Sequence, residues 1–208
     1  QVYEWLWLKG AGSFEAMSNL SKELRQRLGE QFTLPSLTID TTQHSADGTI
    51  KSRFRTHDGH LVEGVLIPTD ERKTACVSSQ IGCSLSCRFC ATGYMERKRN
   101  LEFDEIYDEV VLINRQSEQA YQKKLSNIVF MGMGEPLLNY KNVLKAIERI
   151  TSPDGMGMSP RRITVSTAGV AKMIKQLGDD KVKFKLALSL HAANDKKRNE
   201  IMPINETN

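Results

Sequence analysis

The sequence contains no long apolar run. No window approaches the roughly 18 consecutive apolar residues that a bilayer-spanning helix needs, and residues 1–4, QVYE, are not a basic segment leading into an apolar one. We therefore expect neither a membrane contact nor a secretory signal, and a cytoplasmic location. The chain does not start with Met, and the last residues, NETN, close no element, which suggests a fragment of a longer protein.

Cysteine and aromatic residues are scarce. Aromatics make up 7% of the 208 residues, and the four cysteines, Cys76, Cys83, Cys87 and Cys90, all precede residue 91. A disulfide scaffold would spread its cysteines through the fold, so a metal site in a reducing compartment is favoured over disulfides. With 39% hydrophobic and 26% charged residues, the composition is globular and excludes disordered, collagen-like and coiled-coil chains.

No strong charge of one sign dominates, since 29 basic residues face 25 acidic ones. Basic clusters nevertheless occur at residues 97–99, 161–162 and 196–198. Such clusters can bind nucleic-acid phosphates, but most are solvated faces. Charge alone leaves both interpretations open.

The first 45 residues predict an incomplete helical accessory domain followed by a linker. Apolar residues at helical spacing stop at Gly10 and again before Gly29, which predicts two short helices capped by glycine. Residues 33–45 are polar and predict irregular structure. Two helices cannot enclose a core by themselves, so the accessory domain is expected to extend beyond this chain.

Residues 46–75 predict a β-hairpin, with alternating segments at 49–56 and 61–67 around the turn sequence HDGH. Alternation places Lys51, Arg53 and Arg55 on one face. This basic strip either protects an exposed sheet edge or binds phosphate. Glu63 shares a face with apolar residues, so its carboxylate lies either at the rim of the sheet or in a desolvated position with a raised pKa.

From residue 76 to residue 208 strands alternate with helices. Strands are predicted at 127–131, 163–167 and 182–190, each next to a helical pattern, which is typical of a parallel sheet with right-handed crossovers. About four such units make half of a barrel. The predicted fold class is α/β, a partial (β/α) barrel of the incomplete TIM type behind a small helical domain and a hairpin.

Three cysteines stand in a C-x-x-x-C-x-x-C pattern at Cys83, Cys87 and Cys90. The loop is short enough to bring three thiolates to one face of a cubane iron–sulfur cluster. Electron-transfer clusters use four cysteines, so three leave one iron open to a substrate. A zinc site with three cysteines and one histidine, or a chance grouping of thiols, remains an alternative.

With its aromatic residue before the third cysteine, this motif resembles that of radical S-adenosylmethionine (SAM) enzymes. Four neighbouring segments are similar to the RlmN family, radical SAM adenine methyltransferases acting on ribosomal and transfer RNA: CVSSQIGC at 76–83, MGMGEPLLN at 131–139, STAGV at 166–170 and LSLHA at 188–192. The similarity runs from about residue 61 to residue 205. It implies a partial radical SAM barrel with a [4Fe-4S] cluster and SAM.

The resemblance assigns roles to single residues. It implies that Cys83, Cys87 and Cys90 are cluster ligands, and that SAM is held by Gly134, Glu135, Ser166, Ser189, Leu190 and His191. It also implies that Cys76 helps to resolve a covalent enzyme–RNA intermediate and that Glu63 accepts a proton. Without the resemblance, Gly134 is a plain turn glycine, His191 a satisfied polar residue and Cys76 a buried structural thiol.

The activity implied is methylation of carbon 2 of an adenosine in 23S rRNA and in tRNA, through a methylated cysteine and a 5′-deoxyadenosyl radical. The implied partners are these RNAs and an electron donor such as flavodoxin, and the protein is expected to be a monomer. The family's methyl-carrying cysteine and a late SAM-binding asparagine lie outside this sequence, so the chain alone is predicted not to complete methylation. Two rival functions remain open: a related methyltransferase acting on carbon 8, and a non-catalytic zinc or RNA-binding module.

Overall fold

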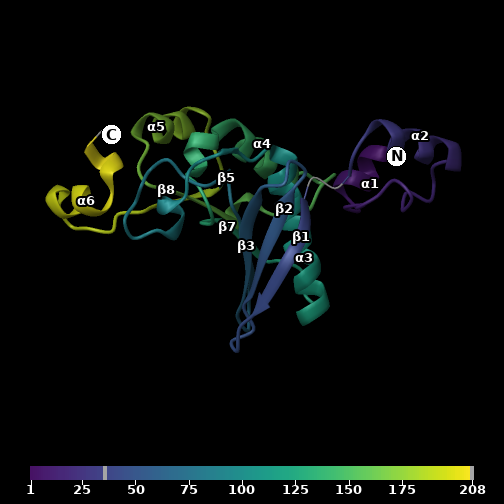
Figure 1. Cartoon of the computed structure of the whole chain (residues 1–208), viewed down its shortest axis with the longest axis horizontal. Helices are drawn as coiled ribbons and strands as arrows, with labels where there is room; N and C mark the ends of the chain where they lie inside the picture. The colour runs from purple at the N-terminus through teal and green to yellow at the C-terminus, as the bar shows by residue number, and fades with distance from the viewer. Residues whose placement is uncertain (35–36, 207–208) are drawn as a thin grey trace.

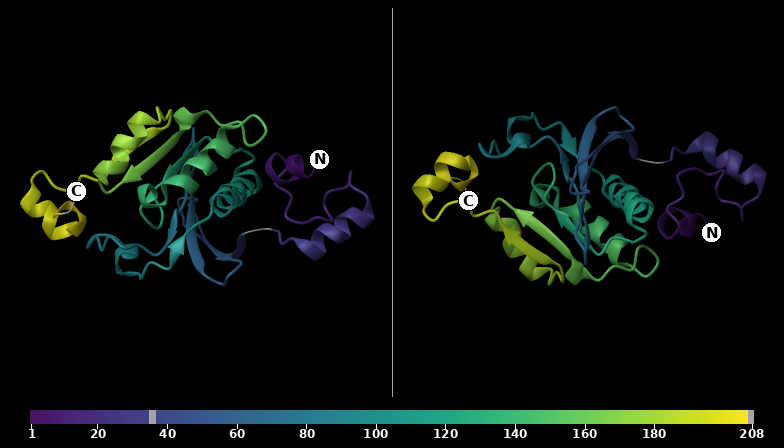
Figure 2. Two further views of the ribbon diagram at one scale, coloured as in Figure 1. Left: turned by 90° about the horizontal axis from the view of Figure 1, so that it is seen from above. Right: turned by 90° about the horizontal axis from the view of Figure 1, so that it is seen from below.

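A computed structural model of the chain describes residues 1–34 and 37–206. The first residues form two short helices, α1 (Val2–Trp7) and α2 (Lys22–Gln31), which lie at one end of the molecule, while the last helix lies at the other end (Figures 1 and 2). The prediction that Gly29 caps the second helix is wrong. α2 begins after Ser21, whose Oγ accepts a hydrogen bond from the Leu24 N–H at 3.2 Å, and the helix runs through Gly29.

One seven-stranded sheet organises the rest of the chain. Three antiparallel strands, β1 (Leu37–His44), β2 (Ile50–Thr56) and β3 (Leu61–Pro68), project as a long ribbon in Figure 1. β4 (Lys73–Cys76) pairs antiparallel with β3 and parallel with β7 (Asn127–Phe130), and β8 (Ile163–Thr167) and β9 (Lys185–Leu188) continue the parallel part. The predicted hairpin and parallel strands are therefore confirmed.

Strand β1 corrects the prediction of irregular structure at 33–45, apart from residues 35–36, which lie outside the described residues. Because β1 pairs with β2, β2 is an interior strand, and its basic strip protects no sheet edge. Asp40 on β1 forms ion pairs with Arg53, at 2.5 Å, and with Arg55. Acidic partners therefore neutralise much of the strip.

The helices α3 (Phe103–Tyr121), α4 (Tyr140–Thr151) and α5 (Ala171–Asp179) cover one face of the sheet. The helix α6 (Asp195–Ile201) lies beyond the sheet at the C-terminal end of the molecule (Figure 1). Before α3 the chain forms a two-stranded sheet of β5 (Gln80–Ile81) and β6 (Arg99–Asn100), with the 3-10 helix η1 (Ala91–Tyr94) between these strands. The 3-10 helices η2 (Pro136–Asn139) and η3 (Pro160–Arg162) precede α4 and β8, and η4 (Pro203–Glu206) follows α6. No helix in the described ranges is long and apolar enough to cross a membrane.

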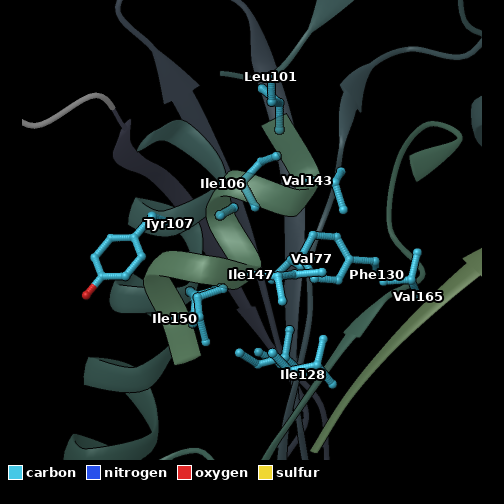
Figure 3. Close-up of a cluster of buried hydrophobic side chains, with 14 of the residues drawn as sticks. Val77, Leu101, Ile106, Tyr107, Ile128, Phe130, Val143, Ile147, Ile150 and Val165 are labelled. Carbon is cyan, nitrogen blue, oxygen red and sulfur yellow. The ribbon is translucent and has the colours of Figure 1, made fainter. Parts of the chain in front are cut away.

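The core lies between α3, α4 and the helix-facing side of the sheet. Ile128, Phe130 and Val165 from the strands and Ile147 and Ile150 from α4 are buried together (Figure 3). Strand alternation then fixes what the opposite face carries. Since Cys76 is in register with Val129 and Val129 with Thr164, that face continues from β4 to β8 and carries Cys76 and, by alternation, Ser166.

Candidate cofactor-binding site

A cavity of about 400 Å³ lies at the carboxyl ends of β7, β8 and β9, the edge at which open and closed parallel sheets bind ligands. Its volume is within the usual range for small-molecule sites. Nine of the predicted site residues line it: Cys83, Cys87, Cys90, Gly134, Glu135, Ser166, Ser189, Leu190 and His191. The fold thus brings together residues that are up to 108 positions apart in the sequence. Two other predicted residues, Glu63 and Cys76, do not line the cavity.

The loop that carries the three cysteines forms one wall of the cavity. It folds through tight turns, in which the Cys90 N–H donates to the Cys87 carbonyl at 3.1 Å and the Gly93 N–H to the Cys90 carbonyl at 2.9 Å. A side chain at Gly93 would meet the Cys87 carbonyl oxygen at 2.4 Å, so the turn requires glycine. All three thiols are free. Burial raises the pKa of Cys83 and of Cys87, and the nearby Cys90 raises both further.

The opposite wall begins with the turn that follows β7. Gly134 adopts a φ of +91°, and a Cβ there would lie 2.4 Å from the Gln80 Cβ, so only glycine fits. The Met133 N–H donates to Ser78 Oγ at 2.8 Å, and the Glu135 N–H donates to Gln80 Oε1 at 2.9 Å. The turn is therefore locked against the segment between β4 and β5.

The Glu135 carboxylate is buried and already has protein partners. Its Oε1 accepts from the Leu137 N–H at 3.0 Å and its Oε2 from the Ala168 N–H at 2.7 Å. Burial raises its pKa. Each carboxylate oxygen has a second acceptor site, so the predicted contact with a ligand amine is compatible with this geometry. In addition, Glu135 ties the β7 turn to the end of β8, a role that the sequence did not indicate.

The ends of β8 and β9 form the third wall. Ser166 Oγ donates to the Phe130 carbonyl at 2.8 Å, and Ser166 is in register with Ala187 on the cavity side. β9 is the edge strand of the parallel part of the sheet. The side chains of Leu186, Leu188 and Leu190 are 43%, 53% and 56% exposed, and Leu188 and Leu190 also line the cavity.

Cys76 and Glu63 lie on the cavity side of the sheet, next to each other across β3 and β4. Cys76 is in register with Val65, two residues from Glu63, so the two form a diagonal pair. Glu63 is 43% exposed and its Oε2 lies 2.9 Å from Lys51 Nζ, which supports the rim position and not the desolvated one. Burial, together with the charge of Glu109, raises the pKa of Cys76 to about 11.

Sequence comparison identifies the family of this site. Residues 77–207 match the family model described as "Radical SAM superfamily". The chain belongs to the radical SAM superfamily. Residues 1–34 match a second model, "Ribosomal RNA large subunit methyltransferase N-terminal domain". The fold agrees, since the crystal structure of a radical SAM methyltransferase from Sphaerobacter thermophilus superposes with a TM-score of 0.93 at 40% identity, covering 99% of this chain and 60% of that one.

Curated relatives confirm the resemblance to the RlmN family. This radical SAM chain is 67% identical to a "Probable dual-specificity RNA methyltransferase RlmN" of Cytophaga hutchinsonii, over all of the chain and 57% of the relative. It is 48% identical to the "Dual-specificity RNA methyltransferase RlmN" of Anaeromyxobacter dehalogenans, over 99% of the chain and 56% of the relative. The chain thus spans less than two thirds of the length of these relatives. The predicted partial radical SAM barrel is confirmed.

Membership in this superfamily implies a [4Fe-4S] cluster and SAM, and the cavity fits them. Among residues 1–34 and 37–206, no three His, Cys, Asp or Glu side chains lie close enough to hold a single metal ion. A cubane cluster, however, binds each thiolate to a different iron and therefore needs thiols around a cavity and not around one point. Cys83, Cys87 and Cys90 stand in that arrangement, with space in front of them.

The sequence did not predict several residues that shape this radical SAM site. Ser78 and Glu109 act behind the β7 turn, and Arg198 and Met202 support the cavity from the C-terminal end. Ser78 lies within the CVSSQIGC segment, so the motif contained a signal for it. The other three have no spacing pattern, because they contact segments that are distant in the sequence.

Proposed function

We propose that this chain forms the cluster-binding and SAM-binding part of an RNA methyltransferase that methylates carbon 2 of an adenosine in 23S rRNA and in tRNA. The observation that carries the proposal is the cavity in which the three-cysteine loop faces Gly134, Glu135 and the ends of β8 and β9. The names of the curated relatives and the superfamily match support it.

The residues divide into two sets within the cavity. Cys83, Cys87 and Cys90 would hold the cluster through three irons and leave the fourth open. The SAM side would consist of Gly134, Glu135, Ser166, Ser189, Leu190 and His191. When bound, the cluster and SAM supply the reductive cleavage that generates a radical, while the protein orients the ligand and excludes water.

Cys76 and Glu63 would act after the radical step, on the cavity side of the sheet. Glu63 is accessible, and its ion pair with Lys51 is half-exposed. The ion pair can therefore break without unfolding of the sheet, and the carboxylate can then accept a proton from the substrate. The high pKa keeps Cys76 a thiol at neutral pH. Such a thiol stays unreactive until a base or a covalent partner is brought to it.

For the chain as a whole we propose three parts: a helical part in residues 1–34, a strand extension in residues 37–75 that includes β1, and the radical SAM core in residues 76–208. The partners would be the two RNAs and a reductant such as flavodoxin, with a monomeric protein. The proposed roles use all four cysteines, and none follows Cys90, so no cysteine of this chain is left to carry the methyl group. This chain alone is therefore expected not to methylate RNA.

Anaerobic reconstitution with iron and sulfide tests the site. We expect about four irons per chain and a reduced EPR signal that changes on addition of SAM. Cys83→Ser should lower the iron content and abolish the SAM response, whereas the matched variant Cys76→Ser should keep both. Preferential binding of zinc, or a cluster that is indifferent to SAM, would contradict the proposal.

Labelled SAM with 23S rRNA and tRNA then tests the limits of the chain. We expect that the chain alone incorporates no methyl group into either RNA. Incorporation would contradict the proposal that a cysteine outside this sequence must carry the methyl group. The same RNAs should then be incubated with a protein that has the full length of its relatives. Mass spectrometry of the nucleosides from these RNAs should show 2-methyladenosine. A product methylated at carbon 8 would reject the proposed position.

A further inference from the structure

Arg198 belongs to one of the basic clusters, residues 196–198, but its side chain is directed toward backbone carbonyls of the cavity wall. Its Nη2 donates to the Ala168 carbonyl at 2.6 Å and to the Ser189 carbonyl at 3.4 Å. Its Nε donates to the Leu190 carbonyl at 3.3 Å. One guanidinium therefore joins the loop after β8 to the residues after β9.

The three carbonyls belong to residues that line the cavity. The N–H of Ala168 is also held by Glu135, so Arg198 and Glu135 fix this peptide segment from two sides. A Cβ at Gly169 would lie 3.3 Å from Arg198 Nη2, which shows that the guanidinium packs against bare backbone. Arg198 itself does not line the cavity and acts from behind the wall.

The helix that carries Arg198 also holds the cysteine loop. The Arg88 N–H, between two of the cysteines, donates to the Ile201 carbonyl at 2.9 Å at the end of α6. Met202 is fully buried and packs with Cys87 and Ala168. Since α6 has only seven residues, it would not be stable without such contacts. α6 therefore connects the cluster wall of the cavity with the strand-end wall.

We propose that Arg198 is a positioning residue for SAM, which sets the spacing between the cysteine loop and the ends of β8 and β9. The inference rests on the proposed function, because it takes the cavity to be the SAM site. A guanidinium suits this role, since it is planar, permanently charged and presents several donors in a fixed geometry. Without it, the carbonyls of Ala168, Ser189 and Leu190 would each lose a hydrogen-bond donor.

The test compares SAM binding with cluster content in the reconstituted chain. Arg198→Ala and Arg198→Lys are measured beside Lys197→Ala, an exposed position on the same helix. Equilibrium dialysis gives the Kd for SAM, and metal analysis gives the iron content. We expect Arg198→Ala to raise the Kd at least about tenfold, or about 1.4 kcal/mol, with unchanged iron. Arg198→Lys should fall between, because an ammonium group lacks the planar fork.

Hydrogen exchange on the apo chain supplies a readout without the cofactor. Amides at 167–170 and 189–192 should exchange faster in both Arg198 variants and not in Lys197→Ala. If Arg198→Ala folds and its Kd for SAM and its exchange rates equal those of the wild type, the proposal is overturned. If that variant does not fold, Arg198→Lys decides in the same way. A wild-type chain that fails to bind SAM would instead reject the proposed function.

Discussion

The ring of Phe89 lies on the ring of His191, with centroids 3.9 Å apart and planes at 37°. Phe89 belongs to the cysteine loop and His191 follows β9, so the contact joins two walls of the cavity. His191 has a φ of +56°, a left-handed conformation in which asparagine, aspartate and histidine are the most frequent residues after glycine. The tilted ring contact helps to hold the histidine ring at the cavity.

We expect the two rings to stabilise SAM binding together. Phe89→Leu and His191→Asn should each raise the Kd for SAM, and Asn tolerates the left-handed backbone. In a double-mutant cycle their effects should be coupled by about 0.5–1.5 kcal/mol, the range for aromatic pairs. Phe32→Leu, at a side chain after α2 that is 59% exposed, is the control and should change little. Strictly additive effects would show that the ring contact does not contribute.

The glycine of the β7 turn permits a sharp test with a matched control. Gly134→Ala places a Cβ 2.4 Å from the Gln80 Cβ at a φ of +91°, so we expect a loss of about 1–3 kcal/mol in the free energy of unfolding. Gly178 lies in helix α5, and a Cβ added there would meet no atom within 4 Å outside the adjoining backbone of the helix. Gly178→Ala should therefore raise the free energy of unfolding by about 0.5–1 kcal/mol. Urea unfolding measures both. Equal effects in the two variants would reject the steric argument.

The sequence predicted the residues that line the cavity better than those that support them. Cys83, Cys87 and Cys90 were predicted from their spacing and the strand-end residues from the family resemblance, and the fold places both sets around one cavity. β1 was missed because only Leu37 of its eight residues is buried, so the strand is held by backbone pairing and shows no apolar alternation. Arg198 and Glu109 were missed because each contacts backbone groups of a distant segment, which leaves no pattern along the chain.

Glu109 is the centre of a buried network behind the β7 turn. Both of its carboxylate oxygens lie 3.1 Å from the Ser78 N–H. Ser78 Oγ in turn donates to the Glu63 carbonyl at 2.6 Å and accepts from the Met133 N–H at 2.8 Å. A Cβ at Gly64 would lie 2.6 Å from Glu109 Oε1. The network therefore joins α3, the strand of Glu63 and the turn that leads to Gly134.

The pH dependence of stability reports on this carboxyl. Burial raises the pKa of Glu109 well above its usual value of 4.5, so the folded state keeps the proton that the unfolded chain releases. Stability contributed by Glu109 is then complete below about pH 4.5 and decreases as the pH rises toward the folded pKa, by at most about 1.4 kcal/mol per pH unit. Glu109→Gln cannot ionise. Its free energy of unfolding should therefore improve relative to wild type between pH 5 and pH 8, as urea titrations at each pH would show.

The control for this comparison is Glu23→Gln, at an exposed position of α2, which should follow the wild-type pH curve. The amide side chain introduced by Glu109→Gln would keep an oxygen for the Ser78 N–H, but its own N–H groups would need new partners, so the variant is expected to be less stable than wild type at pH 4.5. The informative quantity is thus the slope of the difference with pH and not its sign at one pH. Parallel curves for wild type and Glu109→Gln would show that the buried carboxyl has the same pKa in the folded and unfolded chains.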